Sequence, residues 1–133
     1  MGTTSVKFLD FEQLSKAGDY IEIVFSFSLV DAYLVGRPEE DTSTTRARVS
    51  VRMTRSLQSI WRLESPRLEK VMFEYAKRAL QARVSRGSPK EYDQIDLNTT
   101  TAPSICPFDP DRITITPGAG FQVEAQRPLG FRK

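Results

Sequence analysis

The segment from Ser65 to Gly87 limits the folds open to this chain more than any other, because its apolar residues recur at spacings of three and four. Such spacing predicts an α-helix with one apolar stripe. Ser65 can cap the first amide groups, Pro66 suits the first helical position, and Gly87 can adopt the left-handed conformation that ends a helix. The stripe comprises Leu68, Val71, Met72, Tyr75, Ala76, Ala79, Leu80 and Val84. A stripe of this kind is typical of a helix that packs on a hydrophobic core.

Three segments before the helix have the patterns of β-strands. Residues 20–30 and 46–54 alternate between apolar and polar side chains, and residues 6–11 are rich in β-branched and aromatic ones. The alternation breaks near Arg55, where we expect a β-bulge or a bend. We therefore predict the α+β class, with an antiparallel sheet packed against one long helix. The side chains expected to face Leu68, Met72, Tyr75 and Ala79 of the helix are Ile21, Ile23, Phe25 and Phe27.

The segment after Gly87 is rich in proline, aspartate, threonine and serine. Within residues 88–133 we expect an extended arm and a candidate hairpin, the latter at 112–125 around a turn at 117–120. The apolar anchors of the arm would be Tyr92, Ile95, Leu97, Ile105 and Phe108. With 133 residues, the chain is expected to form a single domain, 1–133, that buries roughly two-thirds of its unfolded surface.

The scarcity of cysteine and histidine excludes several functional classes. Cys106 is the only cysteine and there is no histidine. Within one chain this excludes an internal disulfide, a Cys–His nucleophile pair, His-assisted serine chemistry and an ordinary zinc site. We therefore expect a protein that is not an enzyme and uses no cofactor or metal. No apolar run approaches the ~20 residues of a spanning helix. The first residues lack a signal-peptide layout, so we expect a cytoplasmic protein without membrane insertion.

Charge is distributed unevenly along the chain. Residues 1–45 carry a net charge of −5, residues 46–90 carry +9 and residues 91–133 carry −2. A basic section of this kind could bind nucleic acid or an acidic protein, and solvated arginine faces on a strand and a helix explain the same pattern. As a nucleic-acid-binding module, the section 46–90 would use Arg46, Arg48, Arg52, Arg55, Lys77, Arg78, Arg83 and Arg86.

A family resemblance appears on the strands and the helix. The order is VKFLDFEQLSKAGDYIEIVFSFSLVDA, a loop, RARVSVRMTRSLQSIW, and a helix that contains Tyr75-Ala76-Lys77-Arg78 and ends Val84-Ser85-Arg86-Gly87. Pro107-Phe108-Asp109 follows in the proline-rich segment after this helix. In this order and in these motifs, residues 5–110 resemble the SecB family of bacterial export chaperones.

Four features depart from that family's pattern. No strand precedes Val6, the pI is near 8.8 where SecB is acidic, the connection at residues 60–64 is short, and the end QRPLGFRK is basic. SecB docks on the translocation motor SecA through acidic surfaces and a short tail. The departures therefore favour a diverged SecB-like protein, such as the chaperones that guard the antitoxin of a toxin–antitoxin pair, over a general role in protein transport.

The resemblance implies a non-catalytic chaperone that binds unfolded or extended polypeptide segments through apolar contacts and strand-like pairing. It also implies a homo-oligomer, a dimer or a tetramer, with the helices at its centre. Phe73 and Lys77, off the apolar stripe, would then be partly covered by a partner chain. The candidate client-binding residues lie where strands run out into loops, and a core or oligomer contact is the alternative role for each. They are Tyr33, Leu34, Val35, Leu57, Ile60 and Trp61.

Overall fold

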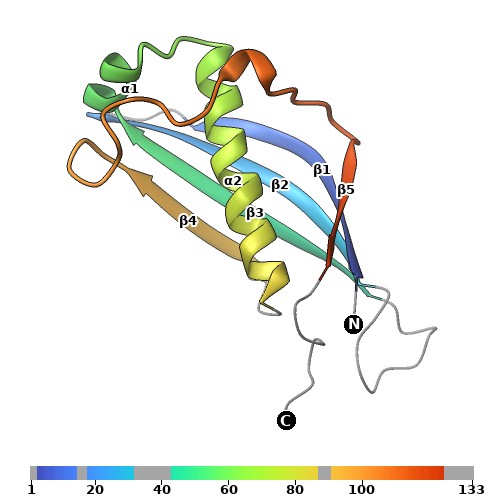
Figure 1. Ribbon diagram of the computed structural model, residues 1–133. Helices are drawn as coiled ribbons and strands as arrows, with labels where there is room; N and C mark the ends of the chain where they lie inside the picture. The colour runs from blue at the N-terminus through green and yellow to red at the C-terminus, as the bar shows by residue number, and fades with distance from the viewer. Residues whose placement is uncertain (1–2, 15–17, 32–42, 87–90, 125–133) are drawn as a thin grey trace.

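The computed structural model describes residues 3–14, 18–31, 43–86 and 91–124, which form a curled five-stranded sheet with two α-helices (Figure 1). The α+β class predicted from the sequence is confirmed. The strands are β1 (Thr3–Leu14), β2 (Tyr20–Asp31), β3 (Ser43–Thr54), β4 (Tyr92–Leu97) and β5 (Gly120–Glu124). The helices are α1 (Arg55–Trp61), α2 (Arg67–Ser85) and the short 3-10 helix η2 (Pro110–Arg112).

The sheet is mixed, so the expectation of a purely antiparallel sheet is wrong. Its strand order is β4-β3-β2-β1-β5, and every neighbouring pair is antiparallel except β3 with β4. After β3 ends at Thr54, the chain runs back along the sheet as α2. It then forms β4 next to β3, with Tyr92 at the start of β4 paired with Arg48. A helical crossover of this kind joins parallel strands. The strand β4 lies in the segment that the sequence indicated as an irregular arm.

The helix α2 covers one face of the sheet, as Figure 1 shows. The predicted inward face of β2 is confirmed, because Ile23, Phe25 and Phe27 are fully buried and Ile21 is nearly so. The buried side chains of α2 are Leu68, Val71, Met72, Phe73, Ala76, Leu80 and Val84. Tyr75 and Ala79, which were expected in this contact, are only half-buried.

Phe73 takes the central position on the buried side of α2. Its ring centroid lies 4.9 Å from that of Phe8, 5.6 Å from Phe25 and 6.2 Å from Phe27. The expectation that a partner chain covers Phe73 is therefore wrong: the chain's own sheet buries it. Lys77 is only half-buried, with Nζ 5.3 Å from the ring centroid of Phe121 on β5, so its partial coverage by a partner chain stays a prediction.

A β-bulge in β1 places two aromatic residues on the same face. Phe8 pairs with Phe27 and Phe11 with Phe25, and the register shifts between Phe8 and Asp10. Residues three apart on a regular strand point to opposite faces, so the extra residue keeps both rings on the side of α2. The Phe11 and Phe25 rings accordingly lie 5.7 Å apart.

Residues 55–61 form the helix α1, where the sequence predicted a bulge or bend. Thr54 caps it, because its hydroxyl accepts a hydrogen bond of 3.2 Å from the Leu57 amide. Arg62 ends α1 in the left-handed conformation, at φ 57°. The expected cap by Ser65 is not made; its hydroxyl donates instead to the Glu69 carboxylate. None of the helices in the described ranges has the length and hydropathy needed to cross a membrane.

The predicted hairpin at 112–125 does not form. Its second arm becomes β5 and pairs with β1, while residues 113–116 are not in a strand. Gly118, at φ +89°, turns the chain so that its amide donates to the Phe8 carbonyl at 2.8 Å. Ala119 accepts from the Phe8 amide at 2.9 Å. The open edge of β1 thus supplies the partner that a hairpin would have supplied locally.

Truncation of Phe25 tests the core. Phe25→Ala removes a fully buried ring that contacts three other phenylalanines, so we expect the free energy of unfolding in urea to fall by ~3–5 kcal/mol. Val24→Ala, one residue away on the opposite face, is the matched control and should cost less than ~1 kcal/mol. Equal losses for the two variants would contradict the assigned register.

Candidate functional site

The candidate residues of α1 differ sharply in exposure. Leu57 is buried, Trp61 is 7% exposed and Ile60 is 51% exposed. Ile60 is thus the one of the three with a large free surface. The candidates Tyr33, Leu34 and Val35 lie outside the described residues.

Trp61 joins two distant parts of the chain. Its indole Nε1 donates a hydrogen bond of 3.0 Å to the carbonyl of Pro103. Its ring stacks on Tyr75 of α2, with centroids 6.3 Å apart and an interplanar angle of 5°. The indole therefore fixes the segment between β4 and η2 against both helices, and its burial leaves little of it for a partner.

A second aromatic contact extends this stack toward η2. The ring of Phe108 meets Tyr75 edge-on, with centroids 4.9 Å apart. The guanidinium of Arg78 lies 4.8 Å from the Phe108 ring centroid and also pairs with Glu74 at 2.7 Å. These contacts hold two half-buried aromatic rings at the surface in a fixed geometry.

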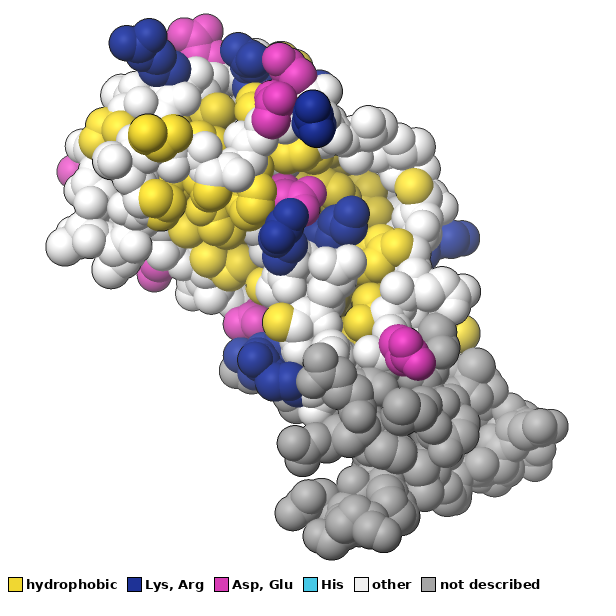
Figure 2. Space-filling view, viewed as in Figure 1, with side chains coloured by type: hydrophobic (Ala, Val, Ile, Leu, Met, Phe, Trp, Pro, Cys, Tyr) yellow, Lys and Arg dark blue, Asp and Glu magenta, His cyan; other side chains and the backbone are white. Residues whose placement is uncertain are grey.

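Ile105 lies in the same segment and is 79% exposed. The sequence indicated it as an anchor, and for Ile105 and Tyr92 that prediction is wrong because both are exposed. The predicted anchors Ile95, Leu97 and Phe108 do pack on the core, together with Ala102 and Cys106. We define the arm surface as Ile60, Tyr75, Ile105 and Phe108. Figure 2 shows apolar side chains gathered between α2 and the segment that follows β4. Of these four residues the sequence indicated only Ile60 as a client contact. Ile105 and Phe108 were missed as contacts because proline-rich segments show no periodicity that separates inward from outward residues.

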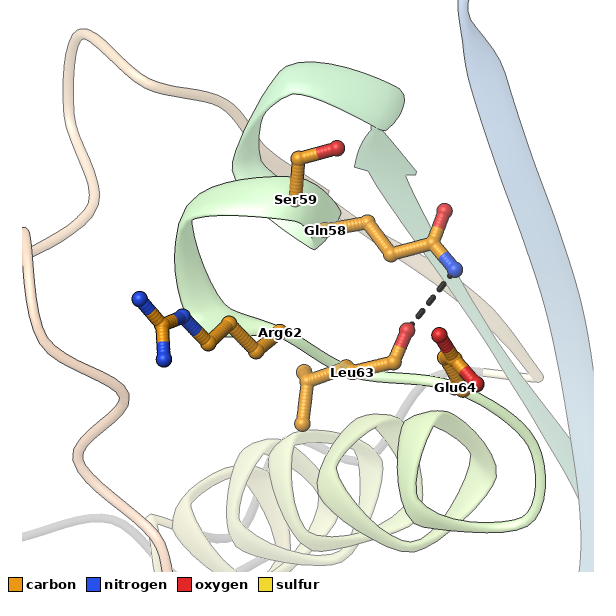
Figure 3. A pocket seen from close by; sticks show the side chains of 5 residues that line it. All are labelled: Gln58, Ser59, Arg62, Leu63 and Glu64. Carbon is orange, nitrogen blue, oxygen red and sulfur yellow. Dashed lines mark hydrogen bonds between the residues drawn. The ribbon is translucent and has the colours of Figure 1, made fainter.

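A hollow of about 450 Å³ lies in the connection between α1 and α2 (Figure 3). All its lining residues come from one stretch of seven, and the Gln58 side-chain amide donates to the Leu63 carbonyl at 2.8 Å. Its ionisable residues, Arg62 and Glu64, are both exposed. The lining residues are Gln58, Ser59, Arg62, Leu63 and Glu64. Leu63 is the one apolar residue in this lining, and the other four residues do not form a set of groups suited to catalysis.

The basic section does not form one surface. The alternation of β3 buries Val49 and Val51 toward α2, so Arg48 and Arg52 lie on the opposite face of the sheet. Arg83 belongs to α2 itself, on the other side.

Several of these cations also have partners within the chain. Arg52 pairs with Asp96 at 3.6 Å, and its guanidinium lies 4.4 Å from the ring centroid of Tyr20. Arg83 pairs with Asp93 at 3.0 Å. Ion pairs of this kind reduce the charge available to a polyanion.

Among the residues that the structure places, Cys106 has no partner suited to nucleophilic catalysis. Its thiol donates to the Phe108 carbonyl at 3.2 Å, and burial raises the pKa of the thiol above its ordinary value of 9.0. Burial also raises the pKa of the neighbouring Tyr75 above 10.0. No group of three acidic, cysteine or histidine side chains suited to a metal ion occurs among the described residues. The chemistry of the surface is therefore that of apolar and aromatic contact.

Comparisons with protein-family models, with curated proteins and with solved structures found no match to this chain.

The burial of Cys106 predicts slow alkylation. Because the thiolate is the reactive form, the iodoacetamide reaction should reach half its limiting rate above pH 9.0, the ordinary value. A peptide spanning residues 103–109 is the control and should react with a lower midpoint. The folded state also holds this proton more tightly than the unfolded state, so stability should fall as the pH rises past 9.0. A midpoint in the folded protein equal to that of the peptide would contradict the buried environment.

Proposed function

We propose that the protein is a non-catalytic, chaperone-like binder of unfolded or extended polypeptide segments. The observation that carries the proposal is the arm surface, which combines the exposed side chains of Ile60 and Ile105 with the joined, half-buried rings of Tyr75 and Phe108. Contiguous exposed apolar surface on a folded domain is typical of an interaction site. Side chains of an unfolded client would lose water on contact with it, which is the main driving force for such binding.

The way the arm surface is built also supports the proposal. It combines side chains from α1, from α2 and from the segment after β4, which Trp61 holds together through its stack on Tyr75 and its bond to Pro103. An aromatic surface fixed in advance costs less conformational entropy on binding than a mobile one. Such a surface can accept many apolar sequences, as a chaperone requires.

The SecB resemblance adds a biological setting to the proposal. A diverged SecB-like chaperone would act in the cytoplasm as a homo-oligomer, on an exported protein or on the antitoxin of a toxin–antitoxin pair. With Phe73 inside the chain's own core, an interface along α2 would use its exposed residues, such as Arg78 and Ala82.

Substitutions on the arm surface test the function. Ile60→Asp combined with Ile105→Asp should weaken binding of a reduced, unfolded client by at least about tenfold, since two apolar contacts are replaced by charges. The matched control is Tyr92→Asp, because Tyr92 is 45% exposed on β4, on the face away from α2. Fluorescence anisotropy with a labelled client measures the affinity, and urea denaturation verifies that both variants fold. An unchanged affinity in the double variant would refute the arm surface.

Salt dependence separates this function from nucleic-acid binding by the section 46–90. Apolar capture of a client should change little between low and moderate ionic strength. Phosphate binding by several arginines should weaken by orders of magnitude over the same range, because each neutralised phosphate releases counterions. We expect weak salt dependence for the client and only feeble DNA binding at physiological salt. Tight, salt-sensitive DNA binding that Arg48→Glu abolishes would favour the alternative.

A further inference from the structure

Within the part of the chain that the structure describes, half of β1 is an unpaired sheet edge. β5 pairs only with residues 3–7 of β1, and Phe8 bonds the turn at 118–119. Within the described ranges, no strand pairs with residues 9–14 of β1 on that side, although β2 pairs with them on the other. An edge of this kind presents backbone amide and carbonyl groups to any extended chain that lies beside it.

An apolar cavity adjoins this edge on the side of α2. Its volume is about 330 Å³, and it lies between Phe11 of β1, the first turn of α2 and the segment at 113–117. Ile113 and Ile115 form part of its wall while packing against the core. The full lining is Phe11, Pro66, Glu69, Lys70, Ile113, Thr114, Ile115 and Pro117. The space suits one or two apolar side chains.

The opposite face of the same half-strand is acidic. Asp10 pairs with Ser26 and Glu12 with Val24, so both lie on the face away from α2, and both are exposed. No ion pair involves either carboxylate among the described residues. Alternate residues of an added strand point to opposite faces. One set would enter the apolar cavity and the other would lie beside the two carboxylates.

We propose that residues 9–14 of β1 bind one extended segment of a client by strand addition, and that this site selects segments in which apolar residues alternate with lysine or arginine. The proposal rests on the proposed function for the nature of the partner and adds a second site with its own specificity. Main-chain hydrogen bonds supply affinity, the cavity selects the apolar positions, and Asp10 and Glu12 select the basic ones.

Short peptides test this site apart from the arm surface. The probe is a labelled octapeptide of alternating valine and lysine, compared with a valine–glutamate octapeptide and with a block peptide of four valines and four lysines. We expect the alternating basic peptide to bind at least about tenfold more tightly than either. NMR amide shifts should be confined to residues 9–14 of β1 and the segment at 113–117. Equal affinities for the three peptides would overturn the proposal.

Backbone pairing is tested on the peptide, which leaves the protein unaltered. One peptide carries N-methyl groups on its valines and another carries them on its lysines. Only one edge of an added strand faces β1, so one methylated peptide should lose at least about tenfold in affinity and the other should retain it. Equal binding of the two would show that no strand is added.

The acidic face is tested with Asp10→Lys combined with Glu12→Lys. This double variant should bind the alternating valine–lysine peptide at least about tenfold more weakly. The control Glu91→Lys combined with Glu124→Lys makes the same charge change at exposed positions and should leave the affinity for the peptide unchanged. Loss of peptide binding on Ile60→Asp and Ile105→Asp instead would assign the peptide to the arm surface, overturning this inference and leaving the proposed function intact. Sizing that shows a dimer whose 9–14 amides are protected from exchange would assign the edge to a second copy and also overturn it.

Discussion

The contact of Phe73 with the sheet determines how the helix and the strands fit together. Its ring lies within 4.9–6.2 Å of three phenylalanine rings that come from two different strands. The three ring pairs are edge-on, tilted and stacked, and such preferred geometries fix the rotation of the helix as well as its position. Once Phe73 points to the sheet, Tyr75 must turn toward α1 and Phe108. The position of the half-buried rings of Tyr75 and Phe108 is therefore a consequence of how Phe73 is buried.

The parts of the fold that depend on a local repeat could be predicted from the sequence. The two-residue alternation of β2 gave the correct inward face, and the spacing of three and four gave α2. Pairings between distant segments have no such local signal. Whether residues 120–124 bond to residues 113–116 or to β1 depends on which edge lies nearest in three dimensions. The bulge in β1 was missed because its extra residue, Leu9, is apolar. The run Phe8-Leu9 therefore does not show where the alternation of inward and outward side chains shifts by one residue.

The same distinction applies to the candidate site. Ile60 and Trp61 are neighbours in the sequence and both apolar, yet one is half exposed and the other buried. Trp61 contacts Tyr75 and donates its indole hydrogen bond to Pro103, which is 42 residues away in the sequence. The arginines show the same effect: they lie in one basic section of the sequence, but the sheet separates those on β3 from those on α2. The net charge of a segment therefore predicts a charged surface only when its side chains are known to lie on the same face of the sheet.

The pairing of β1 with β5 joins segments 117 residues apart, as the contact between Ser5 and Gln122 shows. A ribosome that makes this chain releases β1 long before β5. β1 and β2 can pair early, but one side of β1 stays without its final neighbour until residues 120–124 have been made. Contacts of such long range also slow folding in the isolated protein. A nascent chain that stalls before residue 120 would expose the whole outer edge of β1 and invite pairing with other chains.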